Sequence, residues 1–207
     1  MELLTFLLQT ILISLSGVMV PGAVTAATIA QGTKKPWAGA LIAVGHGILE
    51  IPLIFLLMLG LYLFFQNPWV KLVIGLVGGA FLLWMGFGLL REIKKPGCDP
   101  QKIYTAGPIT TGFVLSATNP YFLFWWATVG LNLALGAREL GGLALVLFAL
   151  VHWLCDLVWL SILTLSAYHG ANLLSQRNQK WILGFCGIAL AGFGIHFIAG
   201  ALLPLMR

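Results

Sequence analysis

The chain has 207 residues, of which 60% are hydrophobic and only 8% are charged. A soluble globular domain carries about 25% charged residues, so this composition excludes a soluble protein and indicates an integral membrane protein. The formal net charge of +5 is therefore interpreted first as a topology signal, and no nucleic-acid partner is expected.

Hydrophobic residues are grouped in six blocks, each about as long as the 20 residues that a helix needs to span the hydrocarbon core of a bilayer. The blocks run approximately over residues 3–31, 37–65, 69–90, 108–135, 140–168 and 181–205. The sequence thus predicts an all-α membrane protein with six transmembrane helices. The first block is expected to remain as a helix, because Glu2 stands where a cleavable signal peptide has basic residues.

Basic residues are distributed unevenly between the connections. Eight of the eleven lysines and arginines follow the first, third and fifth blocks, so these connections are predicted to be cytoplasmic. Both termini would then face away from the cytoplasm, in a multi-pass protein of the cytoplasmic (inner) membrane. The longest connection, residues 92–107, is predicted to be a cytoplasmic linker between a first three-helix unit, residues 1–91, and a second, residues 108–207.

Matching glycines in the two halves indicate an internal repeat. The third block contains Lys71-x3-Gly75-x2-Gly78, and the sixth contains Lys180-x3-Gly184-x2-Gly187. Each half has three spans, an odd number, so the halves would cross the membrane in opposite senses, as the inverted repeats of many secondary transporters do. The alternative is that glycine-rich packing faces recur by chance. Such faces would also permit a homodimer.

Four polar residues lie near the middle of the second and fifth blocks: His46, Glu50, His152 and Asp156. The two histidine–acid pairs are related by one offset of 106 residues, and each pair shares a helix face because its members are four residues apart. A carboxylate at mid-membrane costs at least about 2.5 kcal/mol, so both acids must face partners or a watery cavity. The pattern predicts a substrate or proton site between the repeats. Alternatively, each histidine only neutralises its neighbouring acid and holds helices together.

Two proline motifs predict that the first and fourth helices are broken, because proline removes a backbone donor and crowds the preceding turn. The residues expected at these breaks, and expected to line the site, are Pro21, Gly22, Ala23, Asn119 and Pro120. A short half-helix is predicted from Ala23 to about Ala30, and the fourth block is expected to break in the comparable place. Both new helix N-termini would lie near the membrane centre and favour an anion such as an amino-acid carboxylate. Alternatively, Glu50 and Asp156 cap these helix ends.

The P-G motif of the first block, the following "AVTAATIAQG", Lys34-Lys35, and "SATNPYFLFWWATVG" in the fourth block resemble the lysine exporter (LysE) family of amino-acid efflux proteins. The resemblance covers nearly the whole chain. That family usually has a second proline where this chain has Ala23, so a softer break is expected here. Many members carry an aspartate early in the second span, where this chain has His46 and Glu50. The resemblance implies export of amino acids or related metabolites, coupled to a proton or ion gradient.

The expected function is therefore secondary active export of a small amino acid or related metabolite. Glu50 and Asp156 would alternate between holding the substrate's ammonium group and carrying a proton, and His46 and His152 would tune them. The main alternative is a divalent-metal exporter that uses all four residues as ligands, although two positive helix ends disfavour a dication. Trp125 and Trp126 are interpreted as packing residues, with an aromatic cavity wall as the alternative.

An enzyme is not expected, because H-E-x-x-H and G-x-S-x-G motifs are absent. No cofactor is expected either. The expected partners are the substrate, protons or ions, and the lipid bilayer.

Overall fold

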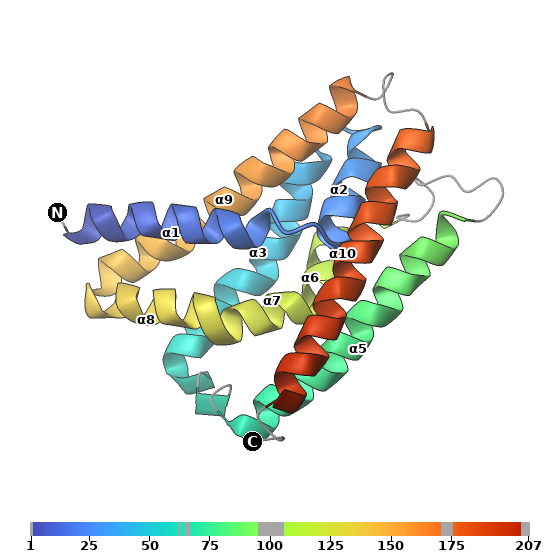
Figure 1. Cartoon of the computed structure of the whole chain (residues 1–207). Helices are drawn as coiled ribbons and strands as arrows, with labels where there is room; N and C mark the ends of the chain where they lie inside the picture. The colour runs from blue at the N-terminus through green and yellow to red at the C-terminus, as the bar shows by residue number, and fades with distance from the viewer. Residues whose placement is uncertain (1, 62, 65–66, 95–105, 171–175, 204–207) are drawn as a thin grey trace.

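The computed structural model describes residues 2–61, 63–64, 67–94, 106–170 and 176–203 (Figure 1). Every regular element in these ranges is helical, which confirms the predicted all-α class. The elements are α1 Glu2–Val18, α2 Ala23–Gly32, α3 Ala38–Leu56, α5 Pro68–Glu92, α6 Pro108–Ala117, α7 Pro120–Trp125, α8 Leu131–Glu139, α9 Gly142–His169 and α10 Gln176–Leu202, with π-helical turns η1 Leu57–Leu61 and η3 Trp126–Gly130. Most of the predicted linker, residues 95–105, lies outside the described residues.

Several helices are long and apolar enough to cross a membrane. Within the described residues these are Ala38–Leu61, Pro68–Arg91, Gly142–His169 and Gly184–Leu202, and the bent pair α1 and α2 makes a fifth candidate. The fourth predicted block is divided between α6 and the continuous run α7–η3–α8. Four or five candidate spans are thus present, compared with the six blocks of the sequence.

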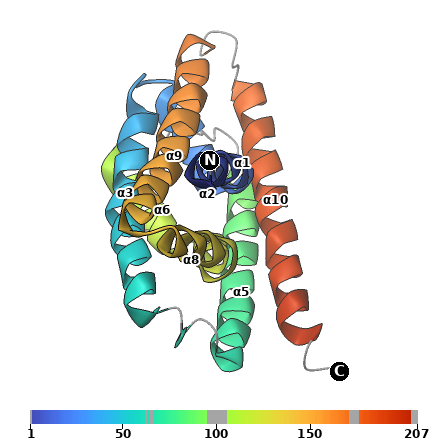
Figure 2. The same ribbon diagram turned by 90° about the vertical axis from the view of Figure 1, so that its left-hand side faces the viewer.

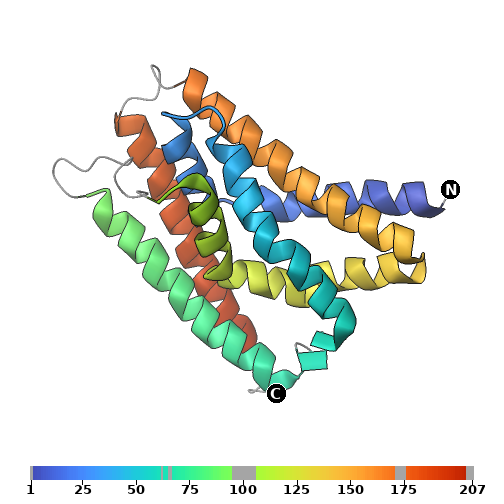
Figure 3. The ribbon, with the colours of Figure 1, turned by 180° about the vertical axis from the view of Figure 1, so that it is seen from behind.

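The helices form two outer pairs with broken segments between them. Seen along α1, helices α3 and α9 lie on one side and α5 and α10 on the other, with α1, α2 and α8 between the two pairs and α6 partly behind α3 (Figure 2). From behind, α5 and α10 run side by side along the molecule, and α1 and α8 project away from them on the opposite side (Figure 3). The short helices α2 and α6 therefore begin or end near the middle of the assembly.

The first helix break is sharp. Helices α1 and α2 are bent by 81°, and Gly22 between them has an extended backbone. The start of α2 at Ala23 is as predicted, but the softer break expected from Ala23 is not seen. Pro21 lacks a backbone N–H and Gly22 readily leaves the helical conformation, so these two residues suffice to end α1.

The second break differs from the expectation that the two blocks break in comparable places. The chain leaves the helix at Thr118 and Asn119, so the short segment, α6, precedes the break. In the first block the short segment, α2, follows it. The reason is the position of the motif: Asn119-Pro120 comes soon after α6 has begun at Pro108, and a long helical run still follows it.

Glycines hold α5 against α10. A Cβ atom added at Gly79 would lie 2.7 Å from the carbonyl oxygen of Gly194, and one at Gly86 would lie 2.7 Å from that of Gly187. Only residues without a side chain allow the backbones to approach this closely. The glycine faces that were expected to permit a homodimer are thus covered by each other within one chain.

Glycines also fix the position of α3. A Cβ at Gly45 would collide with the carbonyl of Ile109, and one at Gly112 would collide with the carbonyl of Ile42. These two contacts hold α3 directly against α6. His46 follows Gly45 by one residue, so this crossing places its side chain beside the end of α6.

The surface is strongly apolar. Large hydrophobic side chains such as Leu59 (83% exposed), Trp84 (70%), Leu143 (70%) and Trp181 (71%) point outward. Soluble monomers rarely expose large contiguous apolar patches, because such patches associate in water. Together with the apolar helices, this surface identifies a multi-pass integral membrane protein.

Candidate substrate site

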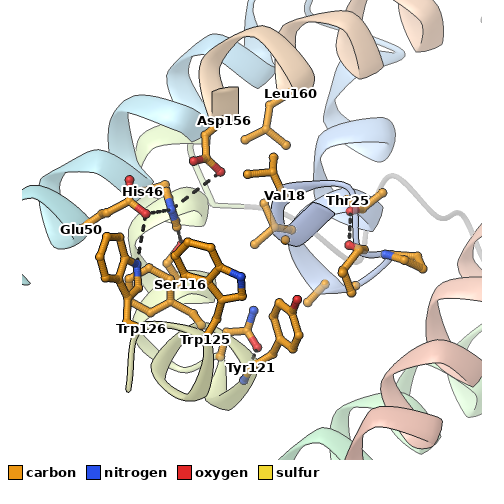
Figure 4. Close-up of a pocket in the computed structure, with 18 of the residues that line it drawn as sticks. Val18, Thr25, His46, Glu50, Ser116, Tyr121, Trp125, Trp126, Asp156 and Leu160 are labelled. Carbon is orange, nitrogen blue, oxygen red and sulfur yellow. Dashed lines mark hydrogen bonds and ion pairs between the residues drawn. The ribbon is translucent and has the colours of Figure 1, made fainter. Parts of the chain in front are cut away.

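The four predicted polar residues meet in the interior. His46 and Glu50 come from α3, His152 and Asp156 come from α9, and each is at most 9% exposed. Both histidines of the group approach one Glu50 oxygen, and the close-up labels one of them, His46 (Figure 4). His46 Nε2 lies 2.9 Å and His152 Nε2 lies 3.1 Å from Glu50 Oε1. The structure therefore joins the two helices through a single carboxylate.

The pairing differs from the expected one, in which each histidine pairs with the acid on its own helix. His152 Nε2 is 4.0 Å from Asp156 Oδ2, and His46 Nε2 is 3.8 Å from Asp156 Oδ1, and both distances are too long for a hydrogen bond. Glu50 binds both imidazoles because α3 and α9 pack closely together. His152 therefore contacts Glu50 on α3 instead of Asp156 on its own helix. Asp156 is left with its carboxyl group available.

Two serines orient the histidines. His46 Nδ1 is 2.6 Å from Ser116 Oγ on α6, and His152 Nδ1 is 2.7 Å from Ser14 Oγ on α1. Ser116 Oγ also lies 2.7 Å from the carbonyl oxygen of Gly112, which can only accept. The single hydroxyl hydrogen therefore serves Gly112, and His46 Nδ1 must be protonated to donate to Ser116. His46 Nε2, on the other side of the ring, then shares a proton with Glu50 Oε1.

Aromatic rings close around the histidines. Trp125 stacks on His152 with ring centroids 4.9 Å apart, and Trp126 approaches the same ring edge-on at 5.2 Å. Phe122 lies edge-on to His46 at 5.1 Å. The Nε1 group of Trp126 donates to Glu50 Oε1 at 3.3 Å. Both tryptophans belong to the buried core and also line the cavity that the quartet faces, so they are packing residues and cavity-wall residues at once.

The quartet faces a cavity of about 100 Å³, which we call the central cavity. A buried water needs about 10–15 Å³ of such space, so several waters or one small solute fit. The predicted break residues Pro21, Gly22, Ala23 and Asn119 belong to its lining, while Pro120 occupies the first turn of α7. Both helix breaks thus lie at the same cavity as the quartet.

Two carboxylate oxygens in this region lack partners. Glu50 Oε2 and Asp156 Oδ2 are buried and have no hydrogen bond to any described residue. A buried anionic oxygen without a donor is costly. A cationic or hydrogen-bonding ligand in the central cavity would remove that cost.

The two helix N-termini at the cavity differ. The side chain of Asn119 accepts a hydrogen bond from the backbone N–H of Tyr121 at 3.0 Å and so caps α7. No described side chain caps α2 at Gly22. The first backbone N–H groups of α2 therefore remain available, with the positive end of the helix dipole behind them. Of these two N-termini, which were both expected to favour an anion, only that of α2 has uncapped backbone N–H groups.

The donor set also resembles that of a metal site. Ligand atoms of His46, Glu50 and Asp156 all lie within 4.8 Å of one another. Imidazole and carboxylate are suitable ligands for several divalent cations. In a transporter such an ion would be the transported substrate.

Sequence reasoning missed Ser14 and Ser116. Both are buried, at 0% and 1% exposure, and each contacts a histidine from the other half of the chain. The available signal was weak: each is a serine in an apolar block, near the proline or asparagine–proline motif that follows it. Small hydroxyl residues are common in membrane helices, so their spacing alone did not identify them.

A helical membrane protein with a buried polar cavity at two broken helices has the construction of a membrane transport protein. Residues 15–200 match the family model described as "LysE type translocator", and the chain therefore belongs to the LysE family. This confirms the family resemblance of the sequence.

Named relatives are consistent with this family. The chain is 29% identical over 153 residues to the "Threonine efflux protein" of Escherichia coli (strain K12), covering 68% of this chain and 71% of the relative. It is 30% identical over 149 residues to the "Threonine efflux protein" of Salmonella typhi, with the same coverage. The "Putative amino acid efflux protein YcgF" of Bacillus subtilis (strain 168) is 28% identical over 182 residues, 85% of this chain and 87% of the relative. No solved structure matches the chain significantly.

Proposed function

We propose that this protein exports small amino acids across the cytoplasmic membrane and binds them as zwitterions in the central cavity. The observation that carries the proposal is the pairing, in one cavity, of buried carboxylate oxygens without partners and an uncapped helix N-terminus. A zwitterion has an ammonium group for the first and a carboxylate for the second. The names of the relatives favour threonine or a similar amino acid as substrate.

The ammonium group would bind at the acids. Asp156 Oδ2 and Glu50 Oε2 offer acceptors without present partners, and an ammonium group has three donors. Charge-assisted hydrogen bonds are stronger than neutral ones, above all where water is scarce. Asp156 is the principal acceptor in this proposal, because Glu50 already binds two imidazoles and an indole.

The carboxylate would bind at the start of α2. The break at Gly22 and Ala23 lines the same cavity as Asp156, and the uncapped backbone N–H groups there suit an anion. The carboxylate would complete the first turn of α2 in the way that Asn119 completes that of α7. The remaining walls, which include Val18, Leu160 and Trp125, would surround the substrate side chain.

Two contacts support an inverted-repeat architecture. Ser14 in the first half binds the histidine of the fifth block, and Ser116 in the second half binds the histidine of the second block, at nearly equal distances. An exchange of the two halves would map one contact onto the other. We propose on this basis that the six predicted spans form two inverted three-helix repeats, with the basic connections in the cytoplasm and both termini outside it.

Proton coupling would follow from shared use of Asp156. A protonated carboxyl group cannot hold an ammonium ion as an anion does, so a proton and a substrate would compete for this residue. Antiport then results if only one of them occupies the site during each crossing. The His46, His152 and Glu50 network would keep the local charge constant while Asp156 changes its partner.

A divalent cation is a weaker candidate. Three ligand atoms are suitably close, but the positive end of α2 at the same cavity opposes a dication. The relatives named above are described as amino-acid efflux proteins. The transport experiment therefore includes manganese and zinc beside the amino acids.

The test is counterflow in proteoliposomes with labelled threonine, a panel of other amino acids, and manganese and zinc. Wild type is compared with Asp156→Asn, Glu50→Gln and the control Glu139→Gln, whose carboxyl group is exposed at the end of α8. We expect threonine exchange in wild type and Glu139→Gln and its loss in the other two variants. Metal flux without amino-acid exchange would overturn the proposal.

A further inference from the structure

A second cavity lies beside the central one. Its volume is about 590 Å³, and it is bounded by the start of α5, the end of α10, and α7 with η3. The polar side chains in its lining are Lys71, Thr128, His196 and the indole of Trp69. It lies at the end of the molecule where α5 begins and α10 ends, opposite the connection between α2 and α3 (Figure 1).

A cluster of packed side chains that includes four aromatic rings joins the linings of the two cavities. Tyr121 and Phe193 line the central cavity, and Phe124 and Phe197 line the second one. The Tyr121 ring stacks on Phe197 with centroids 6.2 Å apart and lies 5.4 Å from Phe193. Phe124 and Phe197 are 4.5 Å apart. Tyr121 thus lines the central cavity and directly contacts Phe197, a ring that lines the second.

The two cavities differ in their charged side chains. The central cavity contains Glu50 and Asp156 beside His46 and His152, whereas the lining of the second contains Lys71 and, within the described residues, no acid. A zwitterion leaving the acids would find a cation for its carboxylate in the second cavity. Lys71 would attract the carboxylate of the leaving substrate, and the described lining has no acid that would hold its ammonium group.

We propose that the second cavity is the exit vestibule of the transport path and that Tyr121 is the gate between it and the substrate site. The chemical class that passes is a zwitterionic amino acid, whose carboxylate is drawn toward Lys71. This proposal rests on the proposed function for the identity of the substrate. The position of the gate rests on the two cavities and the aromatic cluster alone.

The gate is weak enough to open. An aromatic pair contributes about 0.5–1.5 kcal/mol beyond its buried area. Removing the Tyr121 ring would therefore speed passage through the aromatic cluster by up to about tenfold per lost pair. Tyr121→Phe keeps both ring contacts and is the matched control.

The experiment measures access by cysteine labelling. In a background with Cys98, Cys155 and Cys186 replaced by alanine, single cysteines are placed at Thr128 in the second cavity and at Val18 in the central cavity. Proteoliposomes with one protein orientation receive a membrane-impermeant thiol reagent on the side of Lys71. Labelling is followed by mass spectrometry without substrate, so the result does not depend on transport.

We expect fast labelling of Thr128→Cys and slow labelling of Val18→Cys. Addition of Tyr121→Ala should raise the Val18→Cys rate by about tenfold, and Tyr121→Phe should leave it unchanged. Phe197→Leu provides a second opening variant, and an unfolding midpoint in detergent close to that of the parent shows that each variant retains the fold.

Three outcomes would overturn the proposal. Equal rates at both positions with Tyr121 present would show that no gate exists. An unchanged Val18→Cys rate in both opening variants would place the path elsewhere. Labelling of Thr128→Cys in detergent but not in membranes would show that a lipid fills the second cavity. If the labelling rates are as expected but the protein exchanges no amino acid, the gate proposal stands and the proposed substrate is wrong.

Discussion

His152 Nε2 lies 3.1 Å from Glu50 Oε1, although 102 residues separate the two in the chain. This contact joins α9 to α3 and leaves Asp156, one turn after His152, without a hydrogen-bonded histidine. The two acids therefore have unequal contacts, and in the proposed mechanism Glu50 would hold both histidines while Asp156 would exchange partners. The predictions below test that division and the packing that produces it.

Asp156→Asn should remove the pH dependence of substrate binding. In wild type, protons would compete with the substrate's ammonium group for Asp156, so apparent affinity should weaken as pH falls from about 8 to about 5, the range to which functional sites tune acid–base groups, carboxyls included. The amide cannot be protonated in that range, so the variant should bind weakly and equally at each pH. Calorimetric titration with threonine provides the measurement. Retention of the wild-type pH profile would show that another group carries the proton.

Ser14→Ala and Ser116→Ala should destabilise the protein to similar extents. Each removes the partner of a buried histidine, and an unpaired buried polar group costs about 1–3 kcal/mol. Ser16→Ala is the control, because Ser16 is exposed and bonds only to the carbonyl of Ile13 three residues before it. Thermal unfolding in detergent should show lower midpoints for the first two variants and little change for the third. A large difference between Ser14→Ala and Ser116→Ala would count against the equivalence of the two contacts.

Gly45→Ala and Gly112→Ala should be strongly destabilising, because the added methyl group would collide with backbone atoms that cannot move independently. Overpacking of this kind costs about 1–3 kcal/mol or more. Gly88→Ala is the matched control, since a Cβ there meets no other atom within 4 Å, and alanine favours a helix over glycine by about 0.5–1 kcal/mol. Expression level and the unfolding midpoint should fall for the first pair and stay level or rise for the control. Normal stability of Gly112→Ala would contradict the close crossing of α3 and α6.

Trp125→Phe should widen the range of substrates. The indole lines the central cavity and stacks on His152, and the smaller ring would keep the stacking while leaving more space. One methylene in an apolar site is worth about 1–3 kcal/mol of discrimination, so larger amino acids should compete better with threonine than they do in wild type. Trp84→Phe, on the exposed face of α5, should leave the competition series unchanged. An unaltered competition series in Trp125→Phe would show that Trp125 does not contribute to substrate selectivity.

Local motifs made much of this site predictable. Proline and glycine act on their own turn of helix, so Pro21-Gly22 and Asn119-Pro120 located both breaks. The high cost of an acid in an apolar span likewise identified Glu50 and Asp156 as inward-facing. These inferences needed no knowledge of how distant helices pack.

Contacts between distant segments were not predictable in the same way. The sequence did not indicate that Glu50 would take both histidines, because that choice depends on how closely α3 and α9 approach. It did not identify Ser14 and Ser116, whose role exists only where α1 and α6 meet other helices. The glycines of α5 and α10 were visible, but an internal partner and a second copy of the chain produce the same pattern.

The two helix breaks have different relations to the substrate. The break at Asn119 carries its own acceptor, so the first turn of α7 is capped by the chain itself. The break at Gly22 lacks one, so the proposed substrate carboxylate would act as the missing N-cap residue of α2. Binding would then be, in part, the last step of folding for one helical turn, which would become more stable when the substrate is bound.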